Sequence, residues 1–122
     1  MPMKIYVAHS RKDDYKNELY KPIRDSELNK VAEIILPHEN DDDIFDSREE
    51  LKSVDYMIAE VSYPSVAIGI EIGWADMYNV PVILLHKSDS IVSNSVRGVA
   101  TEVIEYSSSE DMVKKLTDFL IK

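Results

Sequence analysis

One glutamate, Glu71, interrupts an apolar stretch and is the first candidate for chemistry. It lies in a predicted helix at residues 66–79, and the positions three and four residues away are all apolar: Ala67, Ile68, Trp74 and Ala75. A carboxylate is costly to bury without a partner, and this helix contains no Lys or Arg. Glu71 is therefore either a reactive carboxylate in a cavity or a residue at the helix edge that reaches solvent.

The residues around Glu71 suggest how a substrate could approach it. Gly69 and Gly73 flank it and are two of the chain's three glycines. Their bare backbone would allow close approach of a substrate, although each weakens a helix by about 1 kcal/mol relative to alanine. Ser65 precedes the helix and is predicted to be its N-cap, and the N–H groups of a helix start can also hold an anion.

A polar segment, residues 9–12, follows the first predicted strand. It offers an imidazole, the Ser10 hydroxyl and the cations of Arg11 and Lys12, which could hold a phosphate or a sugar hydroxyl. The alternative is an ordinary polar loop between a strand and a helix.

Three histidines, His9, His38 and His86, each follow a predicted strand and raise the possibility of a metal site. Their spacing is long, and the sequence contains neither HxH nor HExxH. The acidic run at residues 41–43 lacks the spacing of a calcium loop. We therefore expect no metal, and we count His38 among the candidate substrate-binding residues.

Alternating strands and helices are predicted to position these groups. The strands are expected at residues 4–8, 31–36, 55–61, 80–86 and 101–106, and the helices at residues 11–26, 44–54 and 66–79. Pro22 should kink or shorten the first helix, and a loop at 88–95 can lead into a short one. A last helix should begin after Ser108 or Ser109 and bury Met112, Val113, Leu116, Phe119 and Leu120.

This order predicts one α/β domain over residues 1–122: a flavodoxin-like or Rossmann-like three-layer sandwich with a five-stranded parallel sheet. Ligands of such sheets bind beyond the carboxyl ends of the strands, near the point where the strand order reverses. That rule selects residues 9–12, 37–43, 62–71 and 86–95 as the places to find a site.

Composition narrows the function further. The 122 residues carry a formal net charge of −9, which disfavours binding to a nucleic acid backbone. No apolar run is long enough to span a bilayer, and we expect no secretory signal at the N-terminus. Cysteine is absent, so disulfides and cysteine nucleophiles are excluded and a cytoplasmic protein is favoured. Neither GxGxxG nor a Walker A motif occurs, and no cofactor is expected.

Residues 59–75 (AEVSYPSVAIGIEIGWA) resemble the central signature of the nucleoside 2-deoxyribosyltransferase superfamily, and within it most resemble 2'-deoxynucleoside 5'-phosphate N-hydrolases. Residues 4–10 (KIYVAHS) are similar to that family's first strand and following loop, and residues 93–98 (SNSVRG) to a late segment. The resemblance implies cleavage or transfer at an N-glycosidic bond of a nucleoside or nucleoside 5'-monophosphate.

The resemblance also implies roles for single residues. Glu71 falls on the family's nucleophile, and Tyr6, Ser10 and Ser65 fall on residues that line the sugar and phosphate pocket. Ser93, followed by Asn94, falls on a segment that reaches the neighbouring subunit's site, which implies a homodimer with shared active sites. An aspartate that helps the base to leave corresponds to Asp46, or Ser47 takes its place.

The first loop departs from the family, because Arg11 and Lys12 stand where it has glycines, and Ala67 replaces the first glycine of the central motif. Residues 6–14 (YVAHSRKDD) also resemble the opening of Toll/interleukin-receptor domains, some of which cleave NAD. Two alternatives therefore stay open: a TIR-like NADase or signalling module, and a non-catalytic nucleotide-binding domain of the same fold.

Overall fold

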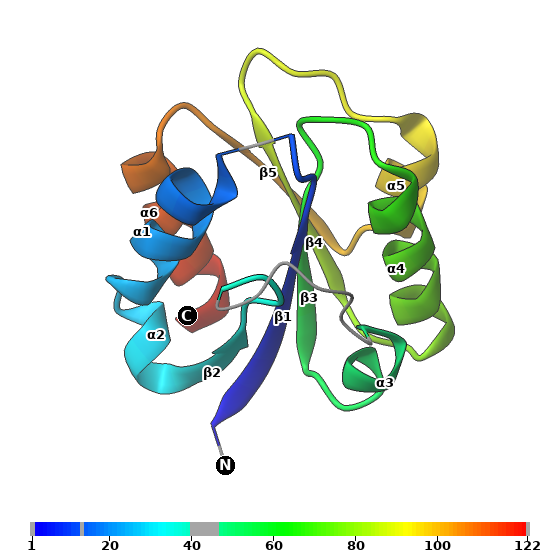
Figure 1. Ribbon diagram of the computed structural model, residues 1–122, viewed down its shortest axis with the longest axis horizontal. Helices are drawn as coiled ribbons and strands as arrows, with labels where there is room; N and C mark the ends of the chain where they lie inside the picture. The colour runs from blue at the N-terminus through cyan, green and yellow to red at the C-terminus, as the bar shows by residue number, and fades with distance from the viewer. Residues whose placement is uncertain (1, 13, 40–46, 122) are drawn as a thin grey trace.

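The computed structural model describes residues 2–12, 14–39 and 47–121 and arranges five strands in one sheet (Figure 1). The strands are β1 (Met3–His9), β2 (Ala32–Ile35), β3 (Tyr56–Glu60), β4 (Val82–Lys87) and β5 (Glu102–Tyr106). Their order is β2-β1-β3-β4-β5, and every neighbouring pair is parallel. This is the flavodoxin-like order, which confirms the predicted fold class.

Helices cover both faces of the sheet, as Figure 1 shows. One face packs against a π-helical turn, η1 (Lys16–Tyr20), and against α1 (Lys21–Arg24), α2 (Leu28–Val31) and α6 (Ser109–Ile121). The other face packs against α3 (Ser47–Leu51), α4 (Val66–Met77) and α5 (Asn94–Val99). Within the described ranges, no helix combines the length and apolar character needed to cross a membrane.

Strand β1, which lies between β2 and β3, supplies both cores by alternation. Ile5 and Val7 are fully buried in the core beneath α1, α2 and α6. Tyr6 and Ala8 point to the opposite face and pack in the core beneath α3 and α4. Successive residues of a strand face opposite sides of the sheet. Tyr6, which lies between Ile5 and Val7, therefore faces α4, the helix that carries Glu71.

The first helix is shorter than predicted and has two parts. The predicted range was residues 11–26, whereas helical structure spans residues 16–24. The Lys21 N–H donates to the Lys16 carbonyl five residues earlier, and Pro22 stands in the first turn of α1. Because proline has no N–H to continue the α-helical ladder, the wider turn before it follows from Pro22.

Other boundaries also differ from the sequence-based prediction. The one-turn helix α2 was not predicted, and α5 begins at Asn94, with the Ser93 hydroxyl accepting from the Ser95 N–H at 3.2 Å. Ser108 caps α6, because its hydroxyl accepts from the Asp111 N–H at 3.1 Å. The prediction that Phe119 is buried was wrong: it is 36% exposed, since the stripe that faces the sheet repeats every four residues through Met112, Leu116 and Leu120.

Candidate active site

A cavity of about 670 Å³ lies at the carboxyl ends of β1 and β3, where the strand order reverses. Its lining comes from β1, from the segments that follow β1, β2 and β3, and from α3 and α4, which is where the fold rule places a ligand. The lining residues are Tyr6, Ala8, His9, Ser10, Arg11, Lys12, Pro37, His38, Ser47, Pro64, Ser65, Ala67, Ile70, Glu71 and Trp74.

Glu71 lies in this cavity beside Tyr6. Its Oε2 accepts a hydrogen bond of 2.7 Å from the Tyr6 hydroxyl, and the carboxylate is half-buried. Burial, followed by the charge of Glu71 and the hydrogen bond to it, raises the pKa of Tyr6 far above its ordinary value, while a hydrogen bond with Ser47 opposes the rise. The phenol therefore stays protonated and holds the carboxylate as its donor.

An aromatic cluster forms another part of the wall. The rings of His9 and Tyr15 stack at 4.1 Å, and the His9 and His38 rings meet edge-on at 5.7 Å. His9 Nδ1 lies 3.2 Å from the Ser10 carbonyl, so its Nε2 accepts the Tyr20 hydroxyl at 2.6 Å. The same Tyr20 oxygen accepts the His38 N–H at 3.1 Å, which joins the loops after β1 and β2.

The short loop after β1 brings cations to the cavity. Ser10 is buried, and its hydroxyl accepts the Lys12 N–H at 3.1 Å, which fixes the turn that presents Arg11 and Lys12. Across the lining, Ser65 caps α4 by accepting the Ile68 N–H at 3.4 Å, which confirms the predicted N-cap. Two cations and three serines in the lining of one cavity suit an anionic, hydroxyl-bearing ligand, even on a chain of net charge −9.

Some of the predicted site residues lie elsewhere. Gly69 and Ser93 line a neighbouring, mostly apolar cavity of about 400 Å³, which shares Pro64 and Ser65 with the main one. A Cβ added at Gly69 would meet no atom within 4 Å, so packing inside this chain does not require glycine there. Asn94 begins α5 and lines neither cavity. Asp46 and the acidic run at 41–43 lie outside the described residues.

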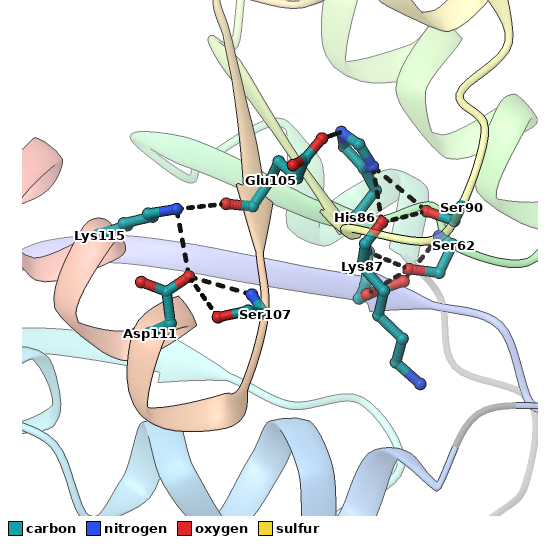
Figure 2. A network of polar contacts seen from close by, with 9 residues as sticks. Ser62, His86, Lys87, Ser90, Glu105, Ser107, Asp111 and Lys115 are labelled. Atoms are coloured by element: carbon teal, nitrogen blue, oxygen red, sulfur yellow. Dashed lines mark hydrogen bonds and ion pairs between the residues drawn. The ribbon is translucent and has the colours of Figure 1, made fainter.

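The three histidines do not converge on one point. His86 is buried at the end of β4, where Nδ1 contacts the Lys87 carbonyl at 3.0 Å and the Ser90 hydroxyl at 3.2 Å (Figure 2). Its Nε2 lies 4.0 Å from a Glu105 carboxylate oxygen. In the part of the chain that the structure describes, no three potential metal ligands of the His, Cys, Asp and Glu types cluster together.

Sequence reasoning missed two residues. Trp74 was treated only as an apolar neighbour of Glu71, yet it lines the main cavity, and the Arg48 guanidinium carbon lies 5.6 Å from its ring centre. Its position three residues after Glu71 on one helix was the available signal. Glu60 is 1% exposed at the end of β3, and one of its donors, Tyr106, lies 46 residues further along the chain, so local spacing did not reveal the cluster.

Comparison with curated proteins finds sequence similarity over part of the chain. A 75-residue segment is 35% identical to a protein of Thermofilum pendens, and a 73-residue segment is 37% identical to one of Methanosarcina mazei. Both are provisionally named 2'-deoxynucleoside 5'-phosphate N-hydrolase 1. Each match covers 57% of this chain, and 52% and 45% of the relatives, so the chain spans about half of their length. No protein-family model matches.

Solved structures share the fold across almost the whole chain. The CMP N-glycosidase BcmB of Clostridium botulinum superposes with a TM-score of 0.74 at 24% identity, covering 96% of this chain and 99% of that one. A 2-deoxyribosyltransferase of Bacillus psychrosaccharolyticus gives a TM-score of 0.60 at 16% identity, with 89% of each chain covered. This protein therefore has the nucleoside 2-deoxyribosyltransferase-like fold, and its distant curated relatives are named as 2'-deoxynucleoside 5'-phosphate N-hydrolases.

Proposed function

We propose that this protein breaks the N-glycosidic bond of a nucleoside or, preferably, a deoxynucleoside 5'-monophosphate, with Glu71 as the nucleophile. The observation that carries the proposal is the 2.7 Å hydrogen bond from Tyr6 to Glu71 inside a cavity of about 670 Å³. A carboxylate that is held by one donor and still faces an open cavity can attack a sugar carbon. The names of the distant relatives support the same bond as the target.

The chemistry requires little more than this carboxylate. As the bond from C1' to the base nitrogen breaks, Glu71 adds to C1' and forms a glycosyl ester, while the bonding pair leaves with the base, which takes up a proton. Water then attacks C1', gives its proton to solvent or a base, and releases the free sugar and the carboxylate. Capture by another base instead of water would give transfer. No metal or redox cofactor takes part in this sequence.

A proton donor for the leaving base completes the proposal. The Ser47 hydroxyl lines the cavity but hydrogen-bonds to Tyr6, and a serine hydroxyl is a weak acid. The sequence therefore favours Asp46 as the donor, and Asp46→Asn should slow release of poor leaving bases more than that of good ones.

The cations of the first loop support a phosphorylated substrate. Arg11 and Lys12 line the cavity together with the hydroxyls of Ser10 and Ser65. A 5'-phosphate carries about two negative charges, which these groups can neutralise and hydrogen-bond. Glu71 is the one carboxylate among the described lining residues, so the other residues of that described lining carry no negative charge that would repel an anion.

A second copy of the chain is part of this proposal. Val66 and Ile91 are 83% and 94% exposed, and the second cavity beside them is mostly apolar and holds Ser93. Apolar surface of this kind on a small protein favours association. In a symmetric dimer formed through this surface, Ser93 of one copy would lie close to the cavity wall at Ser65 of the other copy. A cytoplasmic location, which the cysteine-free composition favours, also belongs to the proposal.

The deciding experiment measures base release by chromatography after incubation with deoxynucleoside 5'-monophosphates, nucleosides and NAD. The wild type should release base from a monophosphate, and Glu71→Gln should lower the rate at least about a thousandfold, because the nucleophile is lost. Glu27→Gln is the matched control, since it removes an exposed carboxylate that pairs with Lys30 on the surface. Release of nicotinamide from NAD alone would favour the TIR-like alternative. Binding without any turnover would favour the non-catalytic one.

A further inference from the structure

The carboxylate of Glu60 is buried at the end of β3 and lines neither cavity. It is 1% exposed, and a carboxylate so far from water requires hydrogen-bond donors. Its Oε1 accepts the Ser62 N–H at 2.8 Å, and its Oε2 accepts the Ser62 hydroxyl at 2.9 Å and the Tyr106 hydroxyl. Two donors thus come from the loop after β3, and one comes from the end of β5.

Ser62 connects this carboxylate to the neighbouring strand. Its hydroxyl accepts the Lys87 N–H at 2.8 Å, which Figure 2 shows at the end of β4. One residue earlier, the Val61 N–H donates to the Leu85 carbonyl at 2.8 Å. The start of the loop is therefore fastened to β4 at two points and, through Glu60 and Tyr106, to β5.

The fastened loop, residues 61–65, leads directly to the main cavity. Pro64 and Ser65 line both cavities, and Ser65 caps α4, the helix that carries Glu71. The Lys87 ammonium lies 5.3 Å from the ring centre of Tyr63 and covers the middle of the loop. A shift at Ser62 would therefore move a cavity wall and the start of the helix that bears the proposed nucleophile.

We propose that Glu60 is a positioning residue for the reaction proposed above, and that it acts through Ser62 to hold residues 61–65 and the start of α4 in place. A carboxylate suits this task because its two oxygens accept all three hydrogen bonds. An amide would offer only one accepting oxygen, and its NH₂ would point either at the Ser62 N–H, which is also a donor, or at the two hydroxyls, which would lose their acceptor. The inference rests on the proposed function, because the reaction is what the position serves.

The test compares two hydroxyls that donate to the same oxygen, Oε2 of Glu60. Ser62→Ala removes one of the two loop donors, the hydroxyl, together with the acceptor of the Lys87 N–H, whereas Tyr106→Phe removes the donor on β5 and leaves the loop attached. Ser62→Thr keeps the hydroxyl and serves as the rescue variant. Melting temperature, kcat and KM for deoxynucleoside 5'-monophosphates are measured for all of them. Calorimetric affinity for the same monophosphates is measured as well.

The inference predicts that Ser62→Ala lowers kcat/KM about tenfold, since displacements of an ångström or less have effects of this order or larger. The kcat/KM of Tyr106→Phe should stay within about twofold of the wild-type value, and Ser62→Thr should recover most of the loss. The melting temperatures of Ser62→Ala and Tyr106→Phe should both be a few degrees lower than that of the wild type. Equal losses in Ser62→Ala and Tyr106→Phe, or a Ser62→Ala enzyme of wild-type efficiency, would overturn the inference and leave the proposed function standing.

A wild type that binds monophosphates without turnover would instead refute the proposed function. The calorimetric affinity for monophosphates then tests the inference. Weaker binding in Ser62→Ala but not in Tyr106→Phe supports control of the cavity wall through Glu60 and Ser62, and equal affinities in the two variants overturn it. A wild type that neither binds nor turns over any monophosphate overturns both.

Discussion

Replacing Tyr6 by phenylalanine isolates the contact on which the proposed mechanism depends. Tyr6 is 2% exposed and its ring stays in the core, so the change removes only the hydroxyl, which donates to Glu71 at 2.7 Å and also hydrogen-bonds with Ser47. A hydrogen bond to a charged group contributes about 1.5–3 kcal/mol. If the transition state uses this bond fully, kcat/KM should fall about 10- to 100-fold, at roughly 1.4 kcal/mol for each factor of ten.

The assay is the initial rate of base release from a deoxynucleoside 5'-monophosphate, followed by chromatography. Tyr106→Phe is the matched control, because it also removes a hydroxyl that donates to a buried glutamate, Glu60, outside the cavity. The control should lose stability and keep its rate. A Tyr6→Phe enzyme within about twofold of the wild type would refute the assignment of Glu71 and Tyr6 as a working pair.

Three further predictions test the surroundings of the site. Arg11→Ala or Lys12→Ala should raise KM for 5'-monophosphates about tenfold and leave that of unphosphorylated nucleosides nearly unchanged, as steady-state kinetics on both would show. Ile91→Asp places a charge on a 94% exposed apolar position, so sedimentation should show a shift from dimer to monomer, whereas an unchanged mass would exclude this surface. The Arg24 guanidinium holds the pKa of Glu39 below its ordinary value. Glu39→Gln should therefore cost less than about 1 kcal/mol of unfolding free energy above pH 4.5, and denaturant titrations should show this cost vanish as the pH falls further and wild-type Glu39 protonates.

Much of the fold could be predicted because strands are marked by short-range patterns. The run at residues 80–86 is almost wholly apolar, as a strand covered on both faces must be, and it became β4. The helical segments were harder where local signals conflict. Pro22 lies inside a helical pattern, and whether a proline kinks or ends a helix depends on the hydrogen bonds of the turn before it. Here the Lys21 N–H reaches the Lys16 carbonyl, a bond that the sequence does not reveal.

The candidate site was predictable in part for a related reason. Glu71 stands out locally, because a carboxylate between apolar neighbours has no obvious partner within its own helix. Its actual partner, Tyr6, is 65 residues away and depends on strand pairing. Glu60 was missed because Tyr106 lies 46 residues further along the chain, and Gly69 was placed beside the nucleophile although its open side faces the neighbouring cavity. Contacts made across the sheet leave no trace in local spacing.

The alternation along β1 has a consequence for how this chain can tolerate change. Ile5 and Val7 belong to one core and Tyr6 and Ala8 to the other, so the phenol reaches Glu71 only by virtue of its parity in the strand. Inserting or deleting a single residue between Ile5 and Ala8 would reverse the facing of the core residues on one side of the change. A change of length by one residue should therefore be forbidden within this stretch of β1.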